Sequence, residues 1–212
     1  NSGKNWLTGN AGNNVLDGKG GIDVMIGKGG NDTYIVNHKS DRVIEKTKGG
    51  SDTIRSSVSE TLSANVENLF LTGKKNLKGY GNSGKNWLTG NSGNNVLEGK
   101  AGRDILTGKG GGDKYVYRST DDSGVTNSTR DIITDFDGTR SDLIDLSKID
   151  AYTATSGNQK FVYIGSDLFS GTQGEVRFAS SILGVNTGTD TKADMQIKLN
   201  GVTDFSAEYL IL

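Results

Sequence analysis

The chain has 212 residues, of which 32% are hydrophobic and 32 are glycine, so its composition excludes a thick conventional core and favours a turn-rich solenoid. It contains no cysteine and no apolar run near eighteen residues, which excludes disulfides and a membrane span. The net charge of −1 is divided unevenly, because residues 1–118 hold 17 Lys and Arg against 11 Asp and Glu, whereas residues 119–212 hold 7 against 14.

A nine-residue unit repeats within residues 1–36. Its first and fourth positions are mostly Gly, its sixth is Asp or Asn, and its eighth is apolar, with units beginning at Gly9, Gly18 and Gly27. Glycine allows the tight turns that bring backbone carbonyls toward one point, where the oxygen of position 6 can join them. Such clusters of hard oxygens suit calcium. Position 8 then points inward from a very short strand.

Two units make one coil of eighteen residues, so position 6 of each unit stacks on position 6 of the second unit along. This register places Asn5 over Asp23, Asn14 over Asp32, and Asp23 over Asp41. Stacked carboxylates repel one another unless a cation lies between them. The repeat therefore predicts a fold that depends on metal, because a metal that binds only the folded chain stabilises folding.

We predict that residues 37–80 form less regular coils between two repeat blocks. The segments 41–44 and 50–54 are degenerate units that add Asp41 and Asp52 as metal ligands, and residues 59–72 are predicted to form spacer strands. The second block spans residues 81–118, with units that begin at glycines.

The two blocks are nearly identical where they begin. Residues 1–19 and 82–100 differ at two positions, and their offset of 81 residues is nine units, which predicts that the second block returns in the same phase. The register stacks Asn86 over Asp104 and Asn95 over Asp113. Continued by nine and eighteen residues, it reaches Asp122 and Asp131 as further ligands.

The chain after residue 118 changes character. Alternating apolar residues at 160–164 and 196–199 predict antiparallel strands that cap the solenoid, as its last apolar layer requires. Residues 141–149 are predicted to form a short helical turn. The acidic cluster of Asp135, Asp137, Asp142 and Asp145 either holds one more calcium or serves as helix caps and turns.

The repeat resembles the glycine-rich nonapeptide of RTX proteins, which implies an all-β fold: a parallel β-roll over residues 1–118 with a C-terminal antiparallel cap over residues 119–212. The departures are lysines at position 2 and asparagine at several sixth positions, which should weaken those sites. The resemblance implies several Ca²⁺ ions, held by side-chain or backbone oxygens of Asn5, Gly9, Ala11, Asn14, Gly18, Gly20, Asp23, Lys28, Gly30, Asp32, Asp41, Asp52, Asn86, Gly90, Ser92, Asn95, Gly99, Ala101, Gly102, Asp104, Gly108, Gly110, Gly111, Asp113, Asp122 and Asp131.

The tail is similar to the C-terminal region of serralysin-type secreted proteins, at segments 131–136, 142–147 and 169–178. This resemblance implies an extracellular protein that leaves the cell through a type I secretion machinery by an uncleaved C-terminal signal. We expect no N-terminal signal peptide, and the start within a repeat indicates a fragment with an upstream catalytic domain. No nucleic-acid partner is expected.

The sequence predicts a module without catalysis of its own. His38 is the single histidine, so a zinc motif of two histidines is excluded, and the chain has neither a GxSxG serine elbow nor a cysteine nucleophile. The leading interpretation is a calcium-binding C-terminal module that folds after secretion.

An alternative hypothesis is a module that binds an anionic polysaccharide such as alginate. The roll carries a net charge of +6, and the chain is similar to the R-modules of mannuronan C5-epimerases at residues 133–136 and 144–147. Trp6 and Trp87 occupy position 7, which faces outward, so they either stack on sugar rings or pack against a neighbouring domain.

Overall fold

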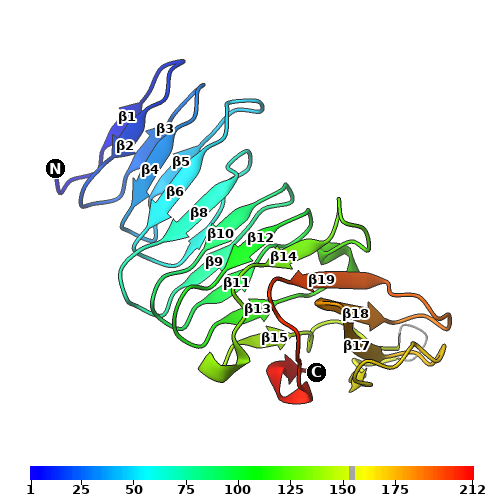
Figure 1. Cartoon of the computed structure of the whole chain (residues 1–212). Helices are drawn as coiled ribbons and strands as arrows, with labels where there is room; N and C mark the ends of the chain where they lie inside the picture. Colours follow the sequence, from blue (N-terminus) through cyan, green and yellow to red (C-terminus); the bar gives the residue numbers. More distant parts are fainter. Residues whose placement is uncertain (153–155) are drawn as a thin grey trace.

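The computed structural model describes residues 1–152 and 156–212 and is an all-β solenoid of about six turns, closed at its C-terminal end by antiparallel strands (Figure 1). Successive strands of the solenoid alternate between one long sheet and two shorter ones. The two shorter sheets together therefore form the face opposite the long sheet. The predicted all-β roll with a C-terminal β cap is confirmed.

Most strands are only three or four residues long. The three-stranded sheet contains β1 (Trp6–Thr8), β3 (Val24–Ile26) and β5 (Arg42–Ile44). The six-stranded sheet contains β7 (Glu60–Thr61), β9 (Lys78–Tyr80), β11 (Val96–Glu98), β13 (Lys114–Val116), β15 (Leu143–Asp145) and β20 (Leu210–Ile211). The eleven-stranded sheet contains β2 (Val15–Asp17), β4 (Thr33–Val36), β6 (Thr53–Ser56), β8 (Asn68–Leu71), β10 (Trp87–Thr89), β12 (Ile105–Thr107), β14 (Asp131–Ile133), β16 (Val162–Tyr163), β17 (Glu175–Ala179), β18 (Ile182–Asn186) and β19 (Met195–Leu199).

The core is a thin stack to which each short strand contributes about one inward side chain. The eighth position of the repeat unit fills it, as predicted, and Met25, Leu88 and Leu106 are fully buried there. Parallel pairing aligns these positions, for example Leu88 with Leu106. Each fully buried apolar side chain stabilises the fold by about 1.5–3 kcal/mol relative to an exposed one.

The prediction that the second block returns in the same phase is wrong, because equivalent strands of the two blocks lie on opposite faces of the solenoid. Trp6 lies in β1 of the three-stranded sheet, whereas Trp87 lies in β10 of the eleven-stranded sheet, on the opposite face. Nine units amount to an odd number of half-coils, which explains the half-turn between the two blocks. Both tryptophans face outward, as predicted for position 7.

The solenoid is continuous along one face only. β6 pairs with β8 through four residues in the eleven-stranded sheet, but on the opposite face β5 and β7 belong to separate sheets. Beside this interruption, Glu60 occupies the register position opposite Gly79, where other strands place an apolar residue. Burial and the nearby Asp41 carboxylate raise the pKa of Glu60 to about 7.

The C-terminal strands differ in three respects from the sequence prediction. Parallel pairing continues past residue 118 through β14 and β15. The segment 141–149 contains the strand β15 instead of a helical turn, and the 3₁₀ turn η2 (Gly138–Arg140) precedes it. β17, β18 and β19 are antiparallel as expected, whereas β16 runs parallel to β17.

The antiparallel strands extend the long sheet because β19 pairs in parallel with β14. Two further 3₁₀ turns, η1 (Thr120–Asp122) and η3 (Ala207–Tyr209), lie in the C-terminal part. Beneath the cap, Phe178 and Phe205 stack with their ring centroids 5.0 Å apart. In the described ranges, no helix has the length and apolar character needed to cross a membrane.

Candidate metal centre

One edge of the solenoid carries a column of carboxylates that link successive coils. The Asn14 backbone N–H donates to Asp32 Oδ1 at 2.6 Å, and the Asp32 N–H donates to Asp52 Oδ1 at 2.8 Å. The Asp52 N–H in turn donates to Glu67 Oε2 at 2.8 Å. Asn14 and Asp32 therefore stack as predicted, and Glu67 is a member of the column that the repeat pattern does not reveal.

The same edge continues through the second block. The Asn86 N–H donates to Asp104 Oδ1 at 2.7 Å, which confirms the predicted stacking of this pair. The Asp104 N–H then donates to Asp131 Oδ1, also at 2.7 Å. Each carboxylate thus uses one oxygen to fix the backbone of the coil before it, and we call this series the first ladder.

The opposite edge carries a second ladder with the same geometry. The Asn5 N–H donates to Asp23 Oδ1 at 2.7 Å, and the Asp23 N–H donates to Asp41 Oδ1 at 2.9 Å. In the second block the donors and acceptors are Asn95 to Asp113 and Asp113 to Asp142, each at 2.7 Å.

The predicted continuation of the register after Asp113 is wrong. The residue that receives the Asp113 N–H is Asp142, 29 residues later, and Asp131 belongs to the other ladder beneath Asp104. Asp122 lies outside both ladders, because its Oδ2 accepts from the Arg118 and Ser119 N–H groups at the start of η1. The longer turns of the cap break the nine-residue count.

The second oxygen of several ladder carboxylates has no partner. Within residues 1–152 and 156–212, the Oδ2 atoms of Asp32, Asp52, Asp104 and Asp131 are buried and make no hydrogen bond. All four residues are at most 1% exposed and lie on the first ladder. A buried carboxylate oxygen without a donor is strongly unfavourable, so each of these oxygens requires either a proton or a cation.

Three carboxylates converge at one point of the first ladder. Oxygens of Asp32, Glu45 and Asp52 all lie within 4.8 Å of one another, which is close enough to share a metal ion. The Tyr34 hydroxyl donates to Glu45 Oε1. Glu45 is a functional candidate that sequence reasoning missed, although its signal was present: eighteen residues after Gly27, it stands where the repeat has glycine.

A similar contact between a tyrosine and a carboxylate recurs at the other block. The Tyr115 hydroxyl donates to Asp135 Oδ1 at 3.3 Å, and Asp135 also accepts from the Gly108 and Lys109 N–H groups at 2.9 and 2.7 Å. Tyr115 corresponds to Tyr34 by the 81-residue offset. Asp135 therefore contacts Tyr115 as Glu45 contacts Tyr34.

The remaining acidic residues of the cap serve local structure. Asp137 caps η2 by accepting from the Thr139 N–H at 3.0 Å and forms a 3.0 Å ion pair with Arg140. Asp145 accepts from the Ser147 hydroxyl at 2.7 Å. Of the two alternatives for the Asp135–Asp145 cluster, the contacts of Asp137 and Asp145 match the caps and turns. Asp142 lies on the second ladder, and Asp135 contacts Tyr115 beside it.

Burial raises the pKa values of carboxylates on both ladders. Desolvation raises the pKa of Asp52 to about 6, and the neighbouring Glu45 and Glu67 carboxylates add to the effect. Desolvation likewise raises the pKa of Asp104 and of Asp113 to about 7, and that of Asp131 to about 8, with the Asp104 carboxylate the next contributor at Asp131. A divalent cation would oppose these shifts, because positive charge favours the ionised carboxylate.

The turns bring backbone carbonyls toward the ladders. A side chain at Gly27 would collide with Asp32, Tyr34 and Glu45, so only glycine lets the backbone approach this closely. Lysine occupies position 2 with positive φ at Lys19, Lys28, Lys100 and Lys109. The carbonyl ligands expected from the sequence lie in these turns, and their coordination of calcium stays a prediction.

The donor set fits calcium. Every candidate ligand is a carboxylate, amide or backbone oxygen; the Asp32, Glu45 and Asp52 cluster contains no histidine, and the chain has no cysteine. Calcium takes six to eight such oxygens in flexible geometry. Asp41 fits less well, because its second oxygen already accepts from the Asn37 and His38 N–H groups at 3.2 and 3.0 Å.

A comparison with protein families agrees with this donor set. Residues 1–34 and 80–115 match the RTX calcium-binding nonapeptide repeat in four copies. A comparison with curated proteins gives no match. A similar solved structure is the extracellular lipase LipA from Serratia marcescens, at 16% identity and a TM-score of 0.34. The match covers 100% of this chain and 39% of the lipase, so the chain spans well under half of that protein's length.

Proposed function

We propose that the two ladders hold calcium ions and that this binding drives the chain to fold. The observation that supports the proposal is the set of buried Oδ2 atoms on Asp32, Asp52, Asp104 and Asp131, which lack partners among the described residues. Calcium would supply the positive charge that these oxygens require. The chain's own residues hold the oxygens in place through the backbone N–H groups of the preceding coils.

The energetic effect of several sites would be large. Calcium at about ten times its dissociation constant stabilises the folded state by about 1.4 kcal/mol per site. Several such sites match the whole stability of an ordinary domain, which is about 5–15 kcal/mol. Each strand contributes only about one side chain to the apolar core. Calcium binding to the ladders would therefore determine whether the chain is folded.

The wider role that we propose is that of a module in a secreted bacterial protein. The chain would remain unfolded where calcium is scarce, leave the cell through a type I machinery that reads its C-terminal end, and fold outside in calcium. The folded solenoid would then support an attached catalytic domain. The match to the RTX calcium-binding repeat supports this role, because a metal that binds only the folded chain makes folding depend on that metal.

Circular dichroism and size-exclusion chromatography in metal-free buffer and in millimolar calcium test the proposed folding. We expect a disordered spectrum and a large hydrodynamic radius without metal, and a β spectrum with a compact radius in calcium. Magnesium at the same concentration is the matched control, because it demands a smaller octahedral site. An ordered, compact chain in metal-free buffer would contradict the proposal.

A further inference from the structure

The turns of the two repeat blocks fall into two types, which differ at positions 2 and 6. In each unit with glycine at position 4, either Lys at position 2 accompanies Asp at position 6, or Asn occupies both. The Lys–Asp turns contain Lys19 with Asp23, Lys28 with Asp32, Lys100 with Asp104, and Lys109 with Asp113. The Asn–Asn turns contain Asn1 with Asn5, Asn10 with Asn14, Asn82 with Asn86, and Asn91 with Asn95. This pairing indicates that the two positions act together in each type.

The two types also differ in backbone conformation. In the Lys–Asp turns positions 2 and 4 have positive φ, as at Lys100 with 66° and Gly102 with 137°. At the equivalent positions of an Asn–Asn turn, neither Asn82 nor Gly84 has a φ in the left-handed region. There the Gly84 N–H donates to Asn82 Oδ1 at 2.9 Å, so the asparagine side chain itself closes the turn.

Position 6 shows what each type of turn requires. A methyl group at Gly99 would collide with Asp104 Oδ2. One at Gly81, the equivalent glycine, would collide with Asn86 Oδ1, so the two oxygens occupy equivalent places. The Asn86 oxygen accepts from the Asn82 N–H at 2.8 Å, whereas the Asp104 oxygen is buried without a partner among the described residues. The Asn–Asn turn is therefore satisfied by neutral groups alone.

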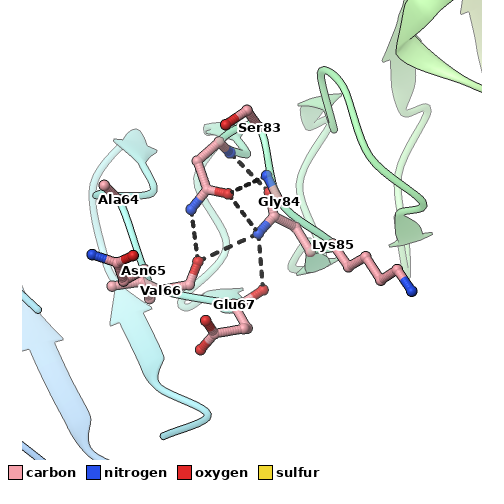
Figure 2. A pocket seen from close by; sticks show the side chains of 9 residues that line it. Ala64, Asn65, Val66, Glu67, Ser83, Gly84 and Lys85 are labelled. Atoms are coloured by element: carbon pink, nitrogen blue, oxygen red, sulfur yellow. Dashed lines mark hydrogen bonds between the residues drawn. The ribbon is translucent and has the colours of Figure 1, made fainter. Parts of the chain in front are cut away.

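Two Asn–Asn turns lie against residues 62–80, which we call the spacer coil. On one edge, Asn82 Nδ2 donates to the carbonyls of Ser63 at 2.9 Å and Val66 at 2.8 Å. A longer contact of 3.3 Å joins Asn86 Nδ2 to the same Val66 carbonyl. Figure 2 shows this junction, which borders a cleft of about 540 Å³, and marks the contacts with Val66 by dashed lines.

The opposite edge of the junction has the same arrangement. Asn91 Nδ2 donates to the carbonyls of Thr72 at 3.2 Å and Lys75 at 3.0 Å. Asn95 Nδ2 contacts the Leu77 carbonyl at 3.5 Å, and the two asparagines are 4% and 1% exposed. Side-chain NH₂ groups thus engage spacer-coil carbonyls on both edges of the solenoid.

These contacts disfavour a cation at the junction. An N–H donor and a cation both seek the negative end of a carbonyl dipole, so an amide that engages a carbonyl competes with an ion for it. The spacer coil holds one acidic residue, Glu67, against Lys74, Lys75 and Lys78. The Glu67 carboxylate already accepts from the Asp52 N–H of the preceding coil. Neither the carbonyls nor the local charge therefore fits a calcium ion.

We propose that the junction between the spacer coil and the second block holds no calcium, because asparagine amides take the place of the ions there. Calcium is confined to the Lys–Asp turns and the carboxylates stacked on them. Asn86 and Asn95 then act as hydrogen-bond donors to the preceding coil and not as metal ligands. This inference deepens the proposed function and rests on it, because it states which turns of the ladders the ions occupy.

The substitution Asn86→Asp in the full chain tests the inference by the sign of its effect. Aspartate keeps the shape of the side chain, but its second oxygen would face the Val66 carbonyl instead of donating to it. We expect the calcium concentration at the folding midpoint, measured by circular dichroism, to rise several-fold. If Asn86 were a ligand, the added charge would strengthen the site and the midpoint would fall. Asn95→Asp repeats the comparison on the opposite edge.

The substitution Asn76→Asp is the matched control. Asn76 is an exposed residue of the spacer coil, and its Oδ1 accepts from the Asn94 N–H at 2.9 Å, which aspartate can also do. The control adds the same charge near the same junction without placing an oxygen against carbonyls. It therefore corrects for the general attraction of calcium by negative charge, and its midpoint should stay close to that of the parent.

Hydrogen exchange of the side-chain NH₂ groups is a second readout that needs no substitution. Asn82 and Asn91 each donate to two spacer-coil carbonyls, whereas Asn76 Nδ2 donates no hydrogen bond within residues 1–152 and 156–212. We expect NMR in saturating calcium to show NH₂ exchange at Asn82 and Asn91 slower than at Asn76 by about tenfold or more.

An Asn86→Asp midpoint equal to or below that of the Asn76→Asp control would overturn the inference, and so would equal NH₂ exchange at Asn82 and Asn76. An Asn86→Asp chain that does not fold in saturating calcium, beside a control that does, shows the expected loss in its largest form. A parent chain that folds without calcium would instead refute the proposed function. The NH₂ exchange could still be measured in that chain, so the two failures are distinguishable.

Discussion

The Asp104 backbone N–H donates to Asp131 Oδ1 at 2.7 Å, although 27 residues separate the two where a regular coil has eighteen. The extra residues form the excursion that contains η1, and the chain returns from it to the same ladder. The ladder is therefore preserved by position in space, not by the sequence count. Both carboxylates are fully buried, and each has one oxygen without a partner among the described residues.

The substitution Asp104→Asn should weaken calcium-dependent folding. The asparagine oxygen can still accept from the Asn86 N–H, but the buried negative charge at Oδ2 is lost. We expect the calcium concentration at the folding midpoint to rise several-fold, because ligand charge sets the affinity of such sites. Circular dichroism during calcium titration measures the midpoint. Asp17→Asn, on an exposed ion pair with Lys19, is the control that should leave it unchanged.

The substitution Glu45→Gln should remove one calcium site. Glutamine can still accept from the Tyr34 hydroxyl, yet the three-carboxylate cluster loses one charge. Isothermal titration calorimetry should show one bound ion fewer, or one site moved to a distinctly weaker class. Glu208→Gln, in the exposed η3 turn, should retain the parent stoichiometry. An identical isotherm for Glu45→Gln and the parent would show that Glu45 is not a ligand.

The raised pKa values of the ladder carboxylates predict how the stability of the metal-free chain depends on pH. The folded-state pKa values of Asp104, Asp113 and Asp131, about 7, 7 and 8, lie above the ordinary value because of burial, so between about pH 4 and pH 8 the folded chain binds more protons than the unfolded chain. Any metal-free fold should therefore lose stability as pH rises through this window. Circular dichroism at pH 5 and pH 8 in metal-free buffer measures the difference as the fraction of folded chain.

Calcium should reverse this trend, because it competes with protons for the same carboxylates. The calcium midpoint of folding should fall as pH rises from 6 to 8. A metal-free chain that is more stable at pH 8 than at pH 5, or a midpoint that does not move with pH, would contradict the assignment of the ladders as the titrating groups.

The substitution Gly27→Ala should destabilise the calcium-loaded chain by about 1–3 kcal/mol, the usual range for an overpacked site. A methyl group there would meet Asp32, Tyr34 and Glu45, so the cluster would have to open. The melting temperature in saturating calcium reports the effect. Gly20→Ala is the matched control, since its methyl would lie 3.6 Å from the nearest atom and needs no rearrangement.

The regular coils could be predicted from the sequence because their geometry is local. Nine-residue spacing places Asn14 over Asp32 and Asn95 over Asp113, and the structure has both contacts. Position 8 fills the core for the same reason, since a fixed period puts it on the inner face of every strand. The general fold follows from these two regularities.

The rest of the candidate site depends on turns of irregular length, whose register no period specifies. Asp142 reaches the second ladder because longer turns bring it there, and Asp122 leaves the predicted register for the same reason. Glu45 lies at the regular spacing after Gly27, but it replaces the glycine by which the repeat is recognised. The half-turn between Trp6 and Trp87, by contrast, follows from the period itself, because nine units are an odd number of half-coils. Polysaccharide binding by the basic roll stays a prediction.

The separation of β5 from β7 has a mechanical consequence. Tension applied between the two ends of the solenoid is shared by two faces within each block, but between the blocks only the β6–β8 pairing carries it on the strand network. Under such tension the β6–β8 pairing would therefore separate before the strand pairings within either block.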